Sequence, residues 1–419
     1  MRKRDRAYSK MQKHGNKGKY RDKFKMLKHL AQKKTREAYW NYISDIIDPI
    51  DSTNERPNPK QFFTYLKTIR KESNGVPTLK AFGETVNEIQ DKTNLLNRQF
   101  QSVFTTDTDK EMPDIPKEVF KEMPEITITE HGVEKLLQNL NPNKACGPDE
   151  LTPRLLKELA HELTPIVTMI FQRSLELGKT PSDWKHAIVC PIYKKGPRHL
   201  PSNYRLVSLT CILCKLMEHI IVSNVMKHLD ENKILSEYQH GFRNQRSCES
   251  QLIGLVHDLT SNMDKNYQTD MIVLDFAKTF DKVSHPRLLH KLEHYGIHGN
   301  NKNWIKSFLN NRTQAVALEN TISDNVDVAS GVPQGSVLCP VLFLIYINDI
   351  TNNITSNIRL FADDCTIYRQ IRTKENQVLL QNDLNKLIKW EGKWKMAFNV
   401  DKCNVMHITR AKKQRNIHT

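Results

Sequence analysis

Apolar residues recur every three or four positions in several long segments of this chain, the spacing of amphipathic helices. The clearest segment runs from Thr152 to Gly178, where a glycine is a typical helix end. Further along, "PVLFLIYINDITNNI" (340–354) predicts an apolar helix, and "NQVLLQNDLNKLIKWEGKWKM" (376–396) predicts another amphipathic one. The pattern therefore predicts helices spread across the second half of the chain.

Short runs rich in apolar and β-branched residues lie between these helices and predict strands. They are "HAIVCPIYKKG" (186–196), "DMIVLDFAKTFDKV" (270–283) and "NIRLFADDCTIYRQ" (357–370). We expect the second to lead into a helix and the third to form a hairpin. Helices and strands in this order predict an α+β domain with a small sheet backed by helices.

The first 125 residues have a different texture. Residues 1–75 are rich in lysine and arginine, and we expect them to form a basic helical region. Residues 76–125 include "TTDTDKEMPDIPKEVFKEMPEI", which is rich in proline and acidic residues, and predict a linker or a surface-hugging extension.

Charge is concentrated at the start of the chain. The formal net charge is +16, and residues 1–40 hold 15 Lys and Arg against three acidic residues, a net charge of +12. Such a segment is either a solvated helix face or an arm that contacts phosphates, and the sequence leaves both open.

Composition excludes two broad classes. Hydrophobic content of 38% and charged content of 26% are typical of a globular protein rather than a disordered or membrane one. The basic start does not resemble a signal peptide, and no run of 18 apolar residues predicts a membrane span. Cys211 and Cys214 form the one close pair of the eight cysteines and are expected to pack in the core. We therefore expect reduced thiols and an intracellular protein, nuclear or cytoplasmic, without a membrane partner.

Two adjacent carboxylates, Asp363 and Asp364, lie inside the predicted hairpin. Neighbouring carboxylates repel each other, although a turn tolerates an Asp-Asp pair well. One interpretation is an exposed turn, and the other is a divalent-metal site at the hairpin tip, where a cation reverses the repulsion.

A third carboxylate shifts the balance toward the metal site. Asp275 ends the apolar run from Met271 to Leu274. Alone, it could cap the helix predicted to follow. Together with the Asp-Asp pair it could bind two cations, which stabilise the attacking and leaving oxygens of a phosphoryl displacement.

At this point the chain resembles the reverse transcriptases of non-LTR retrotransposons of the jockey or CR1 kind. The resemblance covers about residue 141 to the C-terminus, and its motifs occur in the family's order. They are "NKACGPDELTPRLLK", "WKHAIVCPIYKKG", "NYRLVSLT", "EYQHGFRNQRSCESQL", "VLDFAKTFDKVSH", "SGVPQGSVLCPVLFLIYINDI", "LFADDCTIY" and "FNVDKCNVM".

The resemblance implies a right-hand polymerase fold with fingers and palm. Residues 126–174 would form an N-terminal extension of the fingers, and residues 175–419 the fingers and palm. It also implies two Mg²⁺ ions, for which Mn²⁺ could substitute. Their ligands would be the carboxylates of Asp275, Asp363 and Asp364 and the carbonyl of Phe276, with Asp364 the weaker ligand.

Nucleotide-binding residues are also implied. Phe280 matches the family's bulky aromatic, whose ring would clash with a 2′-OH and so select dNTPs; alone it would be interpreted as a core residue. Gln334 and Gly335 lie in "GVPQG", which matches a loop packing on nucleotide and template and could otherwise be a plain turn. Three basic residues lie in motifs that resemble those holding the triphosphate: Lys194, Lys195 and Arg205. They would bind phosphate, and the alternative is that their side chains are merely solvated.

Four more residues match functional positions. Lys402 matches the position proposed to protonate the pyrophosphate leaving group, a role that suits a lysine, although an ordinary surface lysine is the alternative. Lys144, Gly147 and Arg243 lie in motifs that contact the template.

The chain departs from the family's pattern at several positions. They are Cys146, Glu150, Leu206, Ser284 and Cys339. Cys339 stands where glycine is usual, so we expect strain or a blocked approach there. The family's primer grip and thumb would follow Thr419, and its endonuclease has no counterpart here. We therefore expect a partial chain that binds primer–template but polymerises poorly or not at all.

The resemblance predicts an RNA-directed DNA polymerase that adds dNTPs to a primer 3′-OH on an RNA template. Two alternatives remain at this point. One is a catalytically inactive, nucleic-acid-binding remnant of a retroelement. The other is an RNA-templated RNA polymerase, against which Phe280 and the ordered motifs argue.

Overall fold

The computed structural model describes residues 2–13, 18–47, 75–105, 107, 109, 111–116 and 118–410. The chain forms two compact units, Met1–Gly75 and Val76–Thr419. Each unit is described by itself. No helix in the described ranges is both long and apolar enough to cross a membrane.

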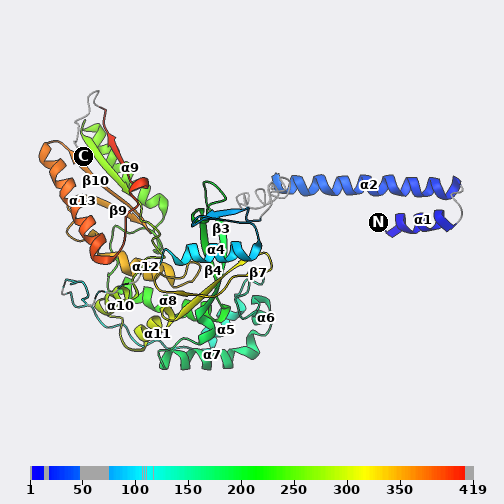
Figure 1. Ribbon diagram of the computed structural model, residues 1–419, viewed down its shortest axis with the longest axis horizontal. Coiled ribbons are helices and arrows are strands. Elements are labelled where there is room, and N and C mark those ends of the chain that lie inside the picture. Colours follow the sequence, from blue (N-terminus) through cyan, green and yellow to red (C-terminus); the bar gives the residue numbers. More distant parts are fainter. Residues whose placement is uncertain are drawn as a thin grey trace. The chain divides into compact units, whose positions relative to one another are not determined.

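The first unit contains two contacting helices, α1 (Arg2–Lys13) and α2 (Gly18–Ile47), drawn in blue in Figure 1. Ala7 is buried between them, and the rings of Tyr8 and Phe24 lie 5.2 Å apart. Most other side chains in both helices are exposed. The basic residues of this region therefore lie on helices with solvated surfaces; residues 48–74 fall outside the described part.

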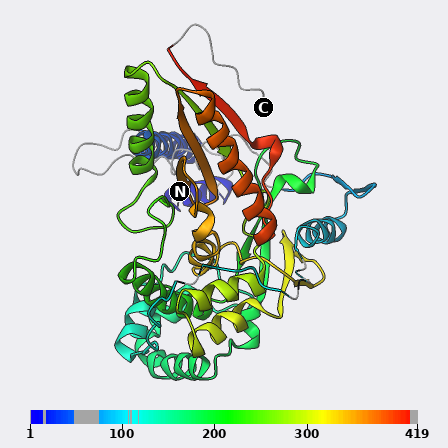
Figure 2. The same cartoon turned by 90° about the vertical axis from the view of Figure 1, so that its left-hand side faces the viewer.

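A four-stranded antiparallel sheet lies toward one end of the second unit, beside helices α9 and α13 (Figures 1 and 2). Its strand order is β11-β5-β10-β9. The elements are β5 (Gln268–Leu274), β9 (Asn357–Phe361), β10 (Asp364–Ile371), β11 (Asn404–Ile408), α9 (Cys248–Asp264) and α13 (Lys374–Trp394). The predicted hairpin over 357–370 is therefore confirmed, because β9 and β10 pair antiparallel.

A second sheet has the order β4-β3-β6-β7, and β8 pairs with β6 outside this path. Its strands are β3 (His186–Tyr193), β4 (Tyr204–Leu209), β6 (Arg312–Leu318), β7 (Thr321–Ile322) and β8 (Val326–Val328). Strand β3 runs antiparallel to β4 and parallel to β6. Of the predicted phosphate ligands, Lys194 and Lys195 directly follow β3 and Arg205 is the second residue of β4; together they form the basic turn.

The linker predicted over 76–125 contains folded elements at its start. They are the hairpin β1 (Leu79–Ala81) and β2 (Glu84–Val86), and the helix α4 (Ile89–Gln101). Leu95, Leu96 and Phe100 of α4 are buried in a core shared with Val189 and Val316 of the second sheet. Over residues 79–101 the apolar face of α4 packs on the second sheet, which is compatible with a surface-hugging extension and not with a free linker.

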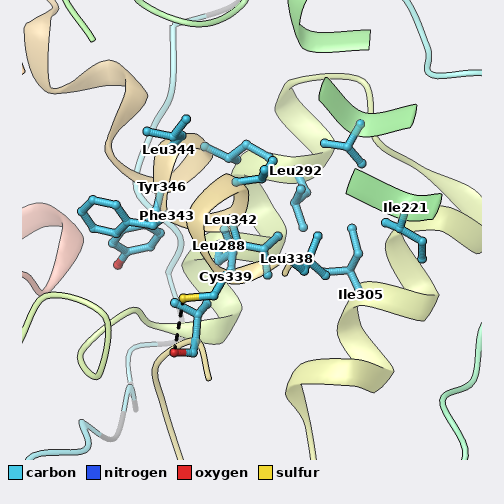
Figure 3. Close-up of a cluster of buried hydrophobic side chains, with 14 of the residues drawn as sticks. Ile221, Leu288, Leu292, Ile305, Leu338, Cys339, Leu342, Phe343, Leu344 and Tyr346 are labelled. Carbon is cyan, nitrogen blue, oxygen red and sulfur yellow. Dashed lines mark hydrogen bonds between the residues drawn. The ribbon is translucent and has the colours of Figure 1, made fainter. Parts of the chain in front are cut away.

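A layer of helices forms the largest core (Figures 1 and 3). The helices are α5 (Glu130–Gln138), α6 (Pro153–Glu158), α7 (Ala160–Glu176), α8 (Ile212–Glu231), α10 (His285–His294), α11 (Gly299–Leu309) and α12 (Cys339–Ile347). Short 3₁₀ turns are η1 (Ser182–Lys185), η2 (Pro201–Asn203), η3 (Asn348–Thr351) and η4 (Val400–Lys402). Cys211 and Cys214 are buried free thiols, as expected. The mixed helices and sheets agree with the predicted α+β class.

Cys339 does not strain the chain. It is the first residue of α12, has no positive φ, and is 4% exposed within the core shown in Figure 3. Its thiol lies 3.7 Å from the carbonyl oxygen of Val332, the contact dashed in the figure. The expected strain is absent because helical backbone at this position accepts any L-residue.

The helix predicted directly after Asp275 is also absent. Residues after β5 form turns, and α10 begins only at His285, where Ser284 accepts a hydrogen bond from the Arg287 amide. Ser284, one of the departures, is thus the N-cap, and the capping alternative for Asp275 is excluded. Phe280 lies in the turns and not on a helix.

Candidate active site

The Asp-Asp pair lies at the tip of the β9–β10 hairpin. Ala362 and Asp363 form the turn, Ala362 with a positive φ of 53°, and Asp364 begins β10. The Ala362 amide donates to the side-chain oxygen of Gln239 at 2.9 Å. The tip is therefore held from below by a residue outside the hairpin.

Gly241 completes this support. A Cβ on Gly241 would lie 2.2 Å from the Ala362 nitrogen, so only glycine allows the two backbones this close. Gln239 and Gly241 belong to "EYQHGFR", a motif from which the sequence singled out only Arg243. Their contact with the tip could not be read from sequence, because some 120 residues separate the two segments.

Strand pairing brings Asp275 to the same place. Cys365 of β10 pairs with Leu274 of β5, so the next positions, Asp364 and Asp275, face each other where the ladder ends. The Asn399 amide donates to the Asp275 carbonyl at 2.7 Å. Phe276 forms a bridge with Phe398, and their rings stack 4.5 Å apart. The strand end is thus fixed on both sides.

The three carboxylates line one cleft in the second unit. Lys402 donates from Nζ to Asp275 Oδ1 at 2.8 Å, and the Thr279 hydroxyl donates to Asp363 Oδ2 at 3.0 Å. Loss of solvent around the Asp364 carboxyl, followed by the charges of Asp363 and Asp275, raises the pKa of Asp364. Negative charge therefore accumulates at this end of the cleft.

The three carboxylates do not form a ready-made metal site with the side chains as they stand. Over the described ranges, no group of three or more His, Cys, Asp or Glu side chains already lies in a metal-holding arrangement. Asp275 is instead paired with an ammonium group. The donor set itself suits Mg²⁺, which prefers carboxylate and carbonyl oxygens.

Basic side chains line the same cleft. Lys194, Lys195 and Arg205 are exposed residues at the ends of β3 and β4. Loss of solvent around Lys194, followed by the positive charges of Arg205 and Lys402, lowers the pKa of Lys194. Lys194, Arg205 and Lys402 thus lie close enough to repel one another, and the charge of Asp275 offsets part of this repulsion.

Gln334 of the loop Gly331–Gly335 and Phe280 form a further wall of the cleft. Phe280 is half-buried; its ring lies 4.8 Å from that of Phe343, and it also lines the cleft. Gln334 lines the cleft too, and its side-chain nitrogen donates to Asp281 Oδ1 at 2.8 Å. Gly335 has a φ of 107° and lies against the Ser208 carbonyl, where a Cβ would be 2.8 Å away.

The residues predicted to contact the template lie elsewhere. Lys144 is exposed but does not line the cleft. Gly147 is buried against the backbone of Cys211, where a Cβ would be only 2.7 Å away, so its requirement for glycine comes from packing. The Arg243 guanidinium donates to the Ser236 carbonyl at 2.9 Å and pairs with Asp230 at 3.7 Å. Arg243 therefore braces the fold.

Comparison with known proteins agrees with the geometry. A family model described as reverse transcriptase (RNA-dependent DNA polymerase) matches residues 192–418. The RNA-directed DNA polymerase from mobile element jockey of Drosophila melanogaster is 30% identical over 310 residues, 69% of this chain and 32% of the relative. The probable RNA-directed DNA polymerase from transposon X-element of the same species is 29% identical over 290 residues, 66% of this chain and 31% of the relative.

The chain spans about a third of the length of these relatives. The family match covers more than half of the chain and includes the carboxylates, the basic turn and the Gly331–Gly335 loop. The predicted resemblance to jockey-like retrotransposon proteins is thereby confirmed. The chain belongs to the reverse transcriptase family.

Proposed function

We propose that this chain catalyses RNA-directed DNA synthesis, adding dNTPs to the 3′-OH of a primer paired with an RNA template. The observation that carries the proposal is one cleft lined both by the three carboxylates and by the basic side chains of Lys194, Lys195 and Arg205. Phosphoryl transfer depends on positioning and on charge stabilisation, and the cleft offers groups for both.

The acidic and the basic residues of the cleft would have different roles. Asp275, Asp363, Asp364 and the Phe276 carbonyl would hold two Mg²⁺ ions. Bound there, the ions would neutralise charge on the attacking and leaving oxygens. Arg205 can bind a triphosphate bidentately, and Lys194 and Lys195 add positive charge. Lys402, whose ammonium pairs with Asp275 in the structure, would donate a proton to the pyrophosphate leaving group.

Sugar selection would come from Phe280. Its contact with Phe343 holds the ring at the cleft wall, where a ribose 2′-OH would clash with it. We expect Phe280→Ala to increase rNTP incorporation relative to dNTP by roughly 10- to 100-fold, while dNTP incorporation remains measurable. Single-nucleotide insertion kinetics with each substrate provide the test. Phe280→Tyr, which keeps the ring, is the matched control. Unchanged discrimination in Phe280→Ala would assign Phe280 to the core alone.

The basic helices would supply general affinity for nucleic acid. Lys23, Lys25, Lys33 and Lys34 are exposed on α2. Replacing all four by Gln should weaken primer–template binding. It should also reduce the slope of the logarithm of the binding constant against the logarithm of the salt concentration by about 0.7–0.9 for each phosphate contact that is lost. Filter binding between low and physiological salt measures both quantities.

Lys227 and Lys374, exposed in the second unit, provide the control pair when changed to Gln. An unchanged salt slope in the α2 variant would show that these helices are merely solvated.

A further inference from the structure

Glu218 is a fully buried carboxylate in the middle of α8, and it is not one of the residues that line the cleft. Burying an ionised carboxylate is costly unless hydrogen bonds satisfy it. One of its oxygens, Oε2, accepts three: from the Ser336 hydroxyl at 2.6 Å, the Val337 amide at 2.7 Å and the Leu338 amide at 3.0 Å. A carboxylate with three donors on one oxygen is a strong, directional anchor.

All three donors come from one short stretch. Ser336 directly follows the Gly331–Gly335 loop, and α12 begins at Cys339. The Ser336 hydroxyl oxygen also accepts from the amides of Leu338 and Cys339, at 3.1 and 3.2 Å. Glu218 and Ser336 together therefore satisfy amides that the start of α12 leaves without partners, and the negative charge suits a helix N-terminus.

The other end of the loop is anchored separately. The amides of Gly331 and Val332 donate to the carbonyls of Val283 and Phe280, both at 2.8 Å. Within the loop, the Gln334 carbonyl accepts from the Ser208 amide at 2.8 Å. Gln334, the side chain that faces the cleft, thus lies two residues from the stretch that Glu218 holds.

We propose that Glu218 is a positioning residue, which fixes the loop so that Gln334 and Gly335 meet the substrate in one geometry. The inference rests on the proposed function for its catalytic consequence. Misplacement of a reacting group by about 1 Å can lower the rate about 10²-fold. A loosened loop should therefore lower kcat more than it raises the KM for dNTP, because the basic turn still binds the triphosphate.

The test compares two Glu218 variants of the full chain. Glu218→Ala removes the acceptor, and Glu218→Gln keeps the shape with a neutral, weaker acceptor. Glu231→Gln, an exposed change at the end of the same helix, is the control. Hydrogen exchange at the amides of Val337 and Leu338 reports the anchor directly, and insertion kinetics per folded molecule report its consequence.

We expect faster hydrogen exchange at the Val337 and Leu338 amides in both Glu218 variants. In the control, exchange at these amides should stay at the wild-type rate. We also expect kcat to fall about 10²-fold in Glu218→Ala, with partial rescue in Glu218→Gln. If Glu218→Ala does not fold, hydrogen exchange at the Val337 and Leu338 amides in Glu218→Gln decides whether Glu218 anchors the loop. Unchanged exchange, or faster exchange with an unchanged kcat per folded molecule, would overturn the proposal. If the wild-type chain incorporates no nucleotide, the proposed function fails, while the exchange result still decides whether Glu218 anchors the loop.

Discussion

Asp363→Asn should lower nucleotide incorporation by on the order of 10³-fold while the chain stays folded. The amide keeps an oxygen that can accept the Thr279 hydroxyl, so the hairpin tip loses little. It removes a negative charge from the end of the cleft where Asp275 and Asp364 also lie. Single-turnover extension of a DNA primer on an RNA template, with Mg²⁺ present, measures the rate.

Asp401→Asn is the matched control, because Asp401 is an exposed carboxylate in η4, beside the cleft residue Lys402. It should extend primers at the wild-type rate. An Asp363→Asn chain that is folded and retains more than a tenth of the wild-type rate would contradict a catalytic role for the hairpin tip.

Lys402→Met should lower kcat by about 10²- to 10⁴-fold, the usual contribution of a general acid. The same change also removes the ammonium that pairs with Asp275 at 2.8 Å. Lys402→Arg separates the two effects, because arginine keeps the ion pair but does not give up a proton in proteins. Pre-steady-state incorporation across a range of pH provides the measurement.

If Lys402 is the proton donor, Lys402→Arg remains slow although it keeps the pair with Asp275. Wild-type kcat in Lys402→Arg would show instead that Lys402 only neutralises Asp275.

Local sequence patterns were sufficient for the elements that carry the site. A short run rich in apolar and β-branched residues predicted the hairpin, and the apolar run before Asp275 predicted its strand. Both are present, and both bring carboxylates to the cleft. The strand ladder then places Asp364 opposite Asp275. These features follow from neighbours in sequence and from one antiparallel pairing.

Predictions that depended on distant contacts were less successful. Gln239 and Gly241 support the hairpin tip, and nothing in their own segment indicates it. The sequence around Arg243 gives no sign that its side chain has partners within the protein. In the structure, however, its guanidinium contacts backbone carbonyl groups and Asp230. The helix α4 was hidden because its apolar residues are few, and only the second sheet gives them a partner.

Primer extension by the full wild-type chain tests the central claim most directly. A DNA primer on an RNA template is incubated with Mg²⁺ and either dNTPs or rNTPs, and the products are separated by length. The proposed function predicts slow but measurable extension with dNTPs, little with rNTPs, and extension about 10³-fold slower with dNTPs for the Asp363→Asn chain. Binding of the primer–template without extension by either substrate, or faster extension with rNTPs, would contradict it.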